Sequence, residues 1–264
     1  MRVGRVERYL HQRLERTGAL HFTLLDPEHK EEDKIRTIID GAEKAGTDAY
    51  LIGGSLGVVQ SVAVHMVKLL RSMTTKPIIL FPGNADAVTH MADAIFFHSL
   101  LNSRNPYWIS GVQALGAPIV RELKIEPIPM AYIIMEPGGT ASFMGDAKPI
   151  PNEKPDIAAA YAMAGQYMGM RIIYLEAGSG AKTPVNPRVV EIVRKAVEVP
   201  IIVGGGIRSA SEAKKRVRAG ADIIVTGTLT EQATDVEKAL TSMIKAIKSE
   251  GKKRLKGSRG LLKL

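Results

Sequence analysis

The stretch AGADIIVTGT, residues 219–228, has a near repeat earlier in the chain, AGTDAYLIGG at residues 45–54. Both read Ala-Gly-x-Asp, then four residues, then glycine. The first glycine is typical of a helix that ends in the left-handed conformation, and the apolar run that follows at once indicates a buried strand. The pair therefore predicts a unit, helix end followed by strand, that the fold uses more than once.

Short apolar runs of this kind recur along the whole chain, and amphipathic stretches with apolar residues three and four apart separate most of them. The runs are residues 21–26, 49–54, 77–83, 93–99, 130–139, 171–178, 200–206 and 222–228. The amphipathic stretches are residues 33–46, 62–73, 155–169, 187–197, 210–220 and 236–250. Eight strands alternating with helices in 264 residues predict an α/β fold of the (β/α)8 or TIM-barrel type. A doubly wound open sheet is the alternative, but eight regular units and the length favour closure.

One side of the predicted barrel departs from the pattern. Residues 83–92, after the third strand, are too few for a normal helix and its two loops. Residues 101–118 make a poor helix because Pro106 and Gly111 lie inside them. We therefore expect the barrel to be modified on this side.

The composition narrows the class of protein. There is no cysteine, which removes disulfides and thiolate chemistry and fits a reducing, cytoplasmic location. No apolar run approaches the roughly 20 residues that span a bilayer, and the first 18 residues contain no apolar core of a secretory signal. The formal net charge of +9 favours anionic partners.

The excess of positive charge is greatest at the C-terminal end. We expect a single barrel domain over residues 1–250 and a basic tail over residues 251–264. The tail is either a frayed, solvated end or a weak contact with anionic lipid, helped by its leucines. It lacks the interleaved aromatic residues of single-stranded nucleic-acid binders, so we expect no nucleic-acid partner.

Two glycine-rich segments follow the last two strands. VGGGIRSASEAKKRV begins at Val203 and TGTLTE at Thr226. Barrels often bind a phosphate with these two loops, because glycine lets backbone N–H groups approach the phosphate oxygens. The best donors are Gly205, Gly206, Gly227 and Thr228. Tight turns with no ligand are the alternative.

A carboxylate stands at the end of the sixth strand. When residues 168–177 are aligned with the repeat, Glu176 falls at the position of Gly53 and Gly227. His98 falls at the same position when residues 91–99 are aligned with it. Both therefore lie at carboxyl ends of strands, where barrels carry their active sites. The segment Gly178, Ser179 and Gly180 extends the anion-binding surface, and burial would raise the pKa of Glu176 as a general base requires. The alternative is a structural carboxylate that holds Arg208 or Lys182.

A second carboxylate, Asp26, ends the first strand in LLDPEHK. One strand-end carboxylate can hold Mg²⁺ when substrate phosphates supply further oxygens, and the hydroxyl of Ser55 lies near enough in the sequence pattern to help. A helix cap is the alternative for Asp26. The six histidines show no metal-ligand spacing, which argues against transition-metal catalysis. Aromatic residues near the rim either line a groove for a long apolar ligand or belong to the core or to a subunit interface. They are Phe97, Tyr107, Trp108, Tyr132 and Phe143.

These motifs in this order closely resemble the geranylgeranylglyceryl phosphate synthase family, over residues 5 to about 248. The segments that carry the resemblance are LLDPEHK, YLIGGSLGV, LLNSRNPYWISG, YLEAGSGA, VGGGIRS and IVTGTLTE. The resemblance implies a modified TIM barrel with the third helix replaced by extended chain. It also implies a Mg²⁺-dependent prenyltransferase that joins sn-glycerol 1-phosphate to geranylgeranyl diphosphate, in the first ether bond of archaeal lipids. Members form homo-oligomers, dimers or hexamers.

The resemblance also assigns residues. It implies that Asp26 and Ser55 bind Mg²⁺. Our hypothesis for Glu176 is that it orients or deprotonates the attacking C3 hydroxyl. It implies that glycerol phosphate is bound by Tyr174, Leu175, Glu176, Ala177, Gly178, Ser179, Gly180, Gly205, Gly206, Gly227 and Thr228. One branch has lysine at the position of Leu24, so Lys148 or Arg208 are candidates for the cation that contacts the diphosphate. Alternatives are the same reaction with another chain length, such as heptaprenyl, a phosphosugar enzyme on the same barrel, or a basic scaffold that binds membrane or nucleic acid.

Overall fold

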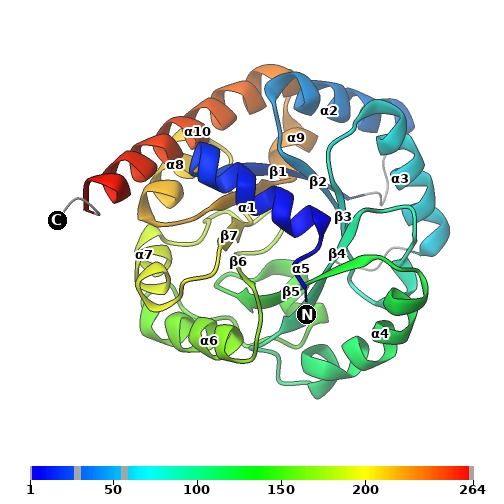
Figure 1. Cartoon of the computed structure of the whole chain (residues 1–264), viewed down its shortest axis with the longest axis horizontal. Coiled ribbons are helices and arrows are strands. Elements are labelled where there is room, and N and C mark those ends of the chain that lie inside the picture. The colour runs from blue at the N-terminus through cyan, green and yellow to red at the C-terminus, as the bar shows by residue number, and fades with distance from the viewer. Residues whose placement is uncertain (1, 27–30, 55–58, 262–264) are drawn as a thin grey trace.

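Eight parallel strands form a closed barrel in sequence order in the computed structural model, which describes residues 2–26, 31–54 and 59–261 (Figure 1). The predicted barrel is thereby confirmed. The strands are β1 (Leu20–Leu25), β2 (Ala49–Gly53), β3 (Ile78–Phe81), β4 (Ala94–Leu100), β5 (Glu126–Ile134), β6 (Ile172–Glu176), β7 (Ile201–Gly204) and β8 (Ile223–Thr226). β5 begins four residues before the predicted run, because Pro127 and Pro129 make its first half read as a loop.

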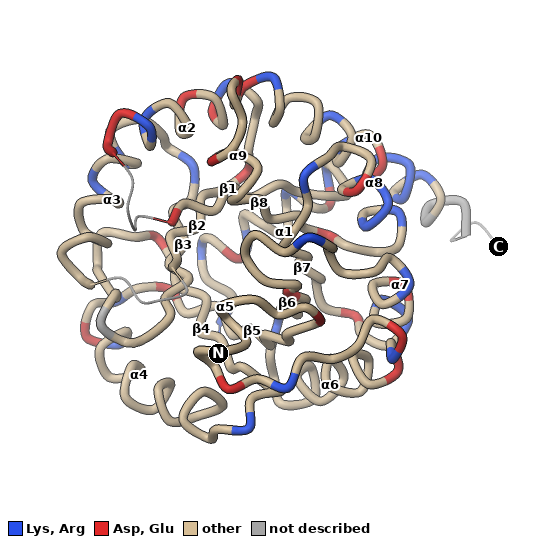
Figure 2. The backbone as a smooth tube through the Cα atoms, turned by 180° about the vertical axis from the view of Figure 1, so that it is seen from behind, with Lys and Arg blue, Asp and Glu red and all other residues tan. Residues whose placement is uncertain are grey.

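Helices surround the barrel and carry most of the charged residues (Figure 2). They are α1 (Arg5–Thr17), α2 (Glu32–Ala45), α3 (Gln60–Met73), α4 (Val112–Glu122), α5 (Gly139–Met144), α6 (Pro155–Tyr167), α7 (Pro187–Ala196), α8 (Ala210–Ala219), α9 (Thr228–Gln232) and α10 (Val236–Leu261). All six predicted amphipathic stretches are helices.

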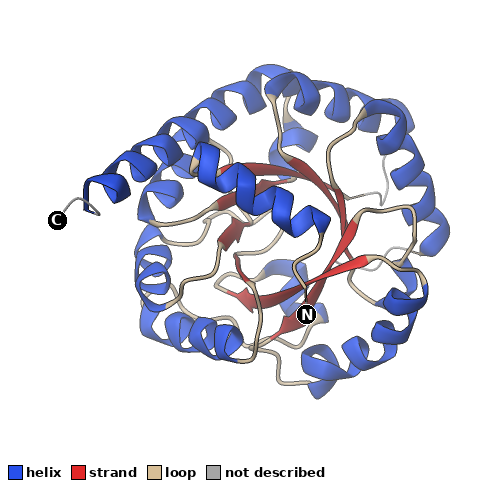
Figure 3. Cartoon of the chain, in the orientation of Figure 1, coloured by secondary structure: helices blue, strands red, loops and turns tan. Residues whose placement is uncertain are grey.

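The ring of helices is incomplete after β3 (Figure 3). Only a 3-10 turn, Ala85–Ala87, lies between β3 and β4, so the helix that normally follows the third strand is absent as expected. The next connection is more helical than predicted, with a π-helical turn at Tyr107–Gly111 that leads into α4. The difference arises because Pro106 lies at the N-cap, where its missing N–H removes no helical hydrogen bond.

Side chains along each strand alternate between the barrel interior and the layer under the helices. In β6, Ile172 and Tyr174 belong to the interior cluster with Phe22 of β1, whereas Ile173 and Leu175 pack into the outer cluster with the helices. This alternation directs Glu176 into the barrel mouth.

Helix α1 crosses the amino ends of the strands and closes that end of the barrel (Figure 1). Val6 and Leu10 are buried in the interior cluster. The Glu126 carboxylate accepts the backbone N–H groups of Val6 and Glu7, at 2.8 and 2.9 Å, and so satisfies two orphan donors of the helix start. Sequence analysis did not predict this helix; its role is closure of the barrel.

The basic tail continues α10, so no helix end falls at the expected boundary between residues 250 and 251. Arg254 donates to the carbonyl oxygens of Val217 and Ala221 and to Asp222, just before β8. The tail therefore lies at the amino ends of the strands, opposite the mouth. Contact with lipid stays a prediction. No helix among the described residues has both the length and the apolar character of a membrane span.

Candidate functional site

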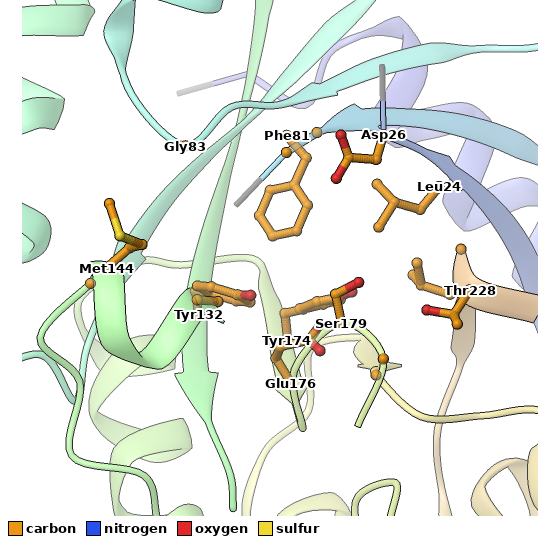
Figure 4. Close-up of a pocket in the computed structure, with 18 of the residues that line it drawn as sticks. Leu24, Asp26, Phe81, Gly83, Tyr132, Met144, Tyr174, Glu176, Ser179 and Thr228 are labelled. Carbon is orange, nitrogen blue, oxygen red and sulfur yellow. The ribbon is translucent and has the colours of Figure 1, made fainter. Parts of the chain in front are cut away.

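A cavity opens at the carboxyl ends of the strands (Figure 4). Its volume is about 240 Å³. A large concave pocket with few convergent polar groups is the default place for a ligand site. The polar groups of its wall include Asp26, Glu176, Ser179, Arg208, Thr228 and Glu231.

Glu176 is buried at the bottom of this cavity, with 6% of its surface exposed. Its Oε1 accepts the Gly178 N–H at 2.6 Å, and it also forms a hydrogen bond with Tyr174. Burial raises the pKa of the Glu176 carboxyl to about 7, although both hydrogen bonds act to lower it. Neither Arg208 nor Lys182 forms an ion pair with it among the described residues, so the structural alternative lacks its partner. The group is therefore poised to exchange a proton near neutral pH.

This raised pKa predicts that Glu176 destabilises the fold at high pH. Between pH 4.5 and about 7 the folded state holds a proton that the unfolded chain loses, so stability falls as pH rises through this range. Glu176→Gln removes the titration. We expect the variant to gain about 2–3 kcal/mol relative to wild type between pH 5 and pH 8. Urea unfolding at both pH values measures this, with the exposed Glu198→Gln as control. If the stability difference between wild type and Glu176→Gln is the same at pH 5 and pH 8, the burial argument is wrong.

Two glycine loops line the wall beside Glu176. Gly178 and Gly180 have φ values of 104° and 70°, and Gly205 and Gly206 have 81° and 70°. This is the left-handed region that favours glycine. The loops also pack closely, since a Cβ on Gly205 would lie 2.3 Å from Glu176 Oε1. Conformation disfavours a side chain at all four positions, and space excludes one at Gly178, Gly205 and Gly206 but not at Gly180, where a Cβ would meet no atom within 4 Å.

These loops leave donors unused. Among the described residues, the backbone N–H groups of Ser179, Gly180, Gly205 and Gly206 have no hydrogen-bond partner. Ser179, Gly180, Gly205 and Gly206 all line the cavity. Adjacent free N–H groups in such conformations form an anion-binding concavity. The structure thus brings the predicted phosphate loop after β7 together with the segment after β6 that was expected to extend it.

The other predicted glycerol-phosphate residues divide into two groups. Tyr174, Gly227 and Thr228 line the cavity with the glycine loops. Leu175 and Ala177 instead point outward and pack in the outer apolar cluster, because they are the alternate residues of β6. Their side chains do not reach the cavity. Lys148 does not line it, whereas Arg208 does.

Asp26 lies across the cavity from Glu176, beside Leu24 and Phe81 (Figure 4). Ser55 lies outside the described residues, so its predicted contact with a metal stays a prediction. Within the described ranges no group of three or more acidic or histidine side chains converges. A single carboxylate fits Mg²⁺, which keeps several waters and takes further oxygens from substrate phosphates, and does not fit a tightly caged transition metal.

The wall on the side of β3, β4 and β5 is mostly apolar and aromatic, although Asn84 also belongs to it. Its apolar and aromatic residues include Phe81, His98, Leu100, Trp108, Tyr132, Ala141 and Met144. The Phe81 ring meets those of Tyr132 and Tyr174 edge-on, at centroid distances of 5.2 and 5.4 Å. Of the aromatics predicted to line a groove, Trp108 and Tyr132 do so.

The other three predicted aromatics lie elsewhere. Phe97 packs in the layer under the helices, and Tyr107 and Phe143 are exposed, Phe143 at 87%. Sequence analysis missed Phe81 and Met144. Phe81 is the last residue of β3 and stands near the end of the predicted run 77–83, so its position near a strand end was the signal available for it. Met144 is the last residue of a helix, α5, that was not predicted.

Comparison with known proteins agrees with this geometry. The PcrB family model matches residues 11–249. The chain belongs to the PcrB family. It is 54% identical over 239 residues to a geranylgeranylglyceryl phosphate synthase of Thermococcus gammatolerans, covering 90% of this chain and 94% of the relative. It is 53% identical over 239 residues to that of Thermococcus kodakarensis, with the same coverage.

A solved structure gives the same result for this PcrB member. The (S)-3-O-geranylgeranylglyceryl phosphate synthase of Thermoplasma acidophilum, in complex with its substrate sn-glycerol-1-phosphate, superposes with a TM-score of 0.88 at 40% identity. The match covers 92% of this chain and 98% of the other. The resemblance seen in the sequence motifs is therefore confirmed.

Proposed function

We propose that this PcrB member is a prenyltransferase that joins sn-glycerol 1-phosphate to geranylgeranyl diphosphate. The observation that carries the proposal is one cavity with two unlike walls. Free N–H groups of the Ser179 and Gly205 loops face it on one side, and the aromatic wall from Phe81 to Tyr132 faces it on the other. A phosphate and an apolar chain thus have separate places, with Glu176 between them. The names of the relatives and the bound substrate of the Thermoplasma structure support the same reading.

The chemistry follows from these positions. The glycerol phosphate is held by its phosphate, which brings the C3 hydroxyl toward Glu176. As the hydroxyl oxygen attacks C1 of the prenyl chain, its proton passes to the Glu176 carboxylate. The bond from C1 to the diphosphate oxygen breaks, and diphosphate leaves with the bonding electrons. The products are the ether and diphosphate.

We assign the Mg²⁺ site to Asp26. A bound Mg²⁺ would neutralise charge on the diphosphate leaving group. Asp26 lies next to Phe81, on the side of that ring away from Tyr132 (Figure 4). A diphosphate near Asp26 would lie at one end of an apolar chain that runs along Phe81 toward Trp108 and Met144. Arg208 and Thr228 also line this mouth.

The aromatic wall also bears on the rival activities. A phosphosugar enzyme needs the glycine loops but has no use for the apolar surface that runs from Phe81 to Met144. A basic scaffold for nucleic acid or membrane needs neither. The chain length of the donor depends on where that surface ends, so heptaprenyl diphosphate remains the second candidate. Homo-oligomer formation and a cytoplasmic location stay predictions.

The proposed function is tested with labelled sn-glycerol 1-phosphate, Mg²⁺ and prenyl diphosphates from farnesyl to heptaprenyl. We expect label to enter the organic phase chiefly with the geranylgeranyl donor, and to disappear with EDTA and return with added Mg²⁺. Asp26→Ala should lower kcat at least about 100-fold, since it removes the metal carboxylate. Asp33→Ala, an exposed carboxylate of α2, is the matched control. Absence of product with every donor would overturn the proposal, and product that resists EDTA would overturn the metal assignment.

A further inference from the structure

The loop between β6 and α7 is held by two arginines of the next β–α unit. Arg208 precedes α8 and Arg216 lies within it. Together they donate to the carbonyl oxygens of Gly180, Ala181, Pro184 and Val185. The first of these residues, Gly180, lines the cavity together with Ser179, and the other three follow it along the loop.

Arg208 grips the part of the loop nearest the cavity. Its Nη2 donates to the Gly180 carbonyl at 2.8 Å and its Nη1 to the Ala181 carbonyl at 2.5 Å. The planar guanidinium thus spans two adjacent peptide groups, as only a fork of donors can. Its own backbone N–H is fixed by Glu212 Oε2 at 2.8 Å, within the capping box of α8. The arginine is therefore anchored at both ends.

Arg216 binds the far part of the same loop and is buried from solvent, with 5% of its surface exposed. Its Nε donates to the Val185 carbonyl at 2.9 Å, its Nη2 to the Pro184 carbonyl at 3.3 Å and its Nη1 to the Glu212 carbonyl at 2.9 Å. Its hydrogen bonds go to carbonyl oxygens and to no carboxylate within the described chain. A buried cation held in this way is unfavourable for a purely structural position, which an apolar residue would fill better.

The arginines also explain the polarity of the loop. The guanidinium groups satisfy the carbonyl oxygens of Gly180, Ala181, Pro184 and Val185 and offset their partial negative charge, which would otherwise repel an anion. The N–H groups of Ser179 and Gly180 stay without partners on the cavity side, among the residues that the structure describes. The acceptors of the loop are thus occupied by the two arginines, while donors in its cavity-lining part are left for an anion.

We propose that Arg208 and Arg216 are positioning residues that set the affinity for the phosphate of glycerol phosphate by holding the carbonyls of residues 180–185, without binding the phosphate through their charge. The proposal rests on the proposed function, in which this loop binds that phosphate. Arg216 separates positioning of the loop from direct binding of the phosphate. It does not line the cavity, so any effect of Arg216 on the ligand must pass through the loop. The rival role for Arg208 is a direct ion pair with a substrate phosphate.

Lysine substitutions separate the two roles, because lysine keeps the positive charge and loses the planar fork. We expect Arg208→Lys and Arg216→Lys to raise the KM for sn-glycerol 1-phosphate about tenfold or more, since a small misplacement of binding groups is enough for such a loss. The KM for the prenyl diphosphate and kcat at saturation should stay within about twofold, because the aromatic wall and Glu176 are unchanged. Arg218→Lys is the matched control, on the same helix but paired with Glu250 at 2.8 Å.

If Arg208→Lys keeps the wild-type KM for sn-glycerol 1-phosphate and only Arg208→Gln raises it, the positive charge of Arg208 is what matters. That result would overturn the proposal for Arg208. A wild-type KM in Arg216→Lys would overturn the transmission through the loop. If Arg216→Lys does not fold, Arg208→Lys still decides, since Arg208 lies at the partly exposed rim. A titration with inorganic phosphate, followed by phosphorus NMR, measures phosphate binding without any prenyl transfer. Its outcome therefore does not depend on the proposed function. Weaker phosphate binding in both lysine variants is expected even if the wild type transfers no prenyl group, and unchanged binding would overturn the positioning role.

Discussion

Glu176→Gln is expected to lower kcat by about two to four orders of magnitude, the usual contribution of a positioned general base. Glutamine preserves the size of the side chain and can still accept the Gly178 N–H, which the wild-type carboxylate binds at 2.6 Å. It cannot take the proton of the attacking hydroxyl. Substrate KM values should change little, because the glycine loops and the aromatic wall remain.

The pH profile is the decisive measurement. Because burial raises the pKa of Glu176 to about 7, kcat/KM of the wild type should rise with pH and level off above this value. The residual activity of the Glu176→Gln variant should lack this step. Glu198→Gln, at an exposed site just before β7, is the control and should keep the wild-type profile. Full kcat with an unchanged profile in Glu176→Gln would exclude the base role.

Asp48→Ala is expected to destabilise the fold by about 3–5 kcal/mol, because it removes a buried carboxylate and leaves the partly buried Lys248 ammonium and the backbone N–H of His21 without their partner. Asp48 is 1% exposed and lies just before β2. Its Oδ1 binds Arg13 of α1 at 2.7 Å, and its Oδ2 binds Lys248 of α10 and accepts the backbone N–H of His21. One carboxylate therefore joins the first helix, the last helix and β1 at the amino end of the barrel.

Guanidinium unfolding of Asp48→Ala against wild type measures this loss. The control is Asp40→Ala, whose side chain is 54% exposed in its pair with Lys44 and should change stability by no more than about 1 kcal/mol. At a temperature where the variant is folded its kcat should be near that of wild type, since Asp48 lies at the end of the barrel opposite the cavity. A loss no greater than that of Asp40→Ala would refute the linking role.

Local pattern was enough to identify the barrel. Eight apolar runs such as residues 222–228 and six helical stretches correspond to real elements, because strands buried on both faces and helices with one apolar face leave strong periodic signals. The short segment after β3 was readable from its length alone. Helix α1 was missed because its buried residues, Val6 and Leu10, are few among charged neighbours.

Part of the candidate site could also be predicted from local sequence pattern. Strand-end position and glycine content placed Glu176 and the Gly205 loop at the mouth of the barrel. Leu175 and Ala177 were included only because they belong to the family motif, and the alternation of β6 turns them outward. Phe143, grouped with the groove aromatics, is exposed on α5.

The sequence by itself determined the order of elements, the glycine positions that permit an anion-binding loop and the carboxylate beside it, since these are set by local conformation and periodicity. Only the tertiary structure decided which groups meet. The raised pKa of Glu176 arises from burial, the aromatic wall joins residues as distant in the sequence as Phe81 and Tyr132, and Arg208 and Arg216 reach the loop of another β–α unit. Such contacts depend on the closure of the barrel, which brings together segments that carry no local sign of one another.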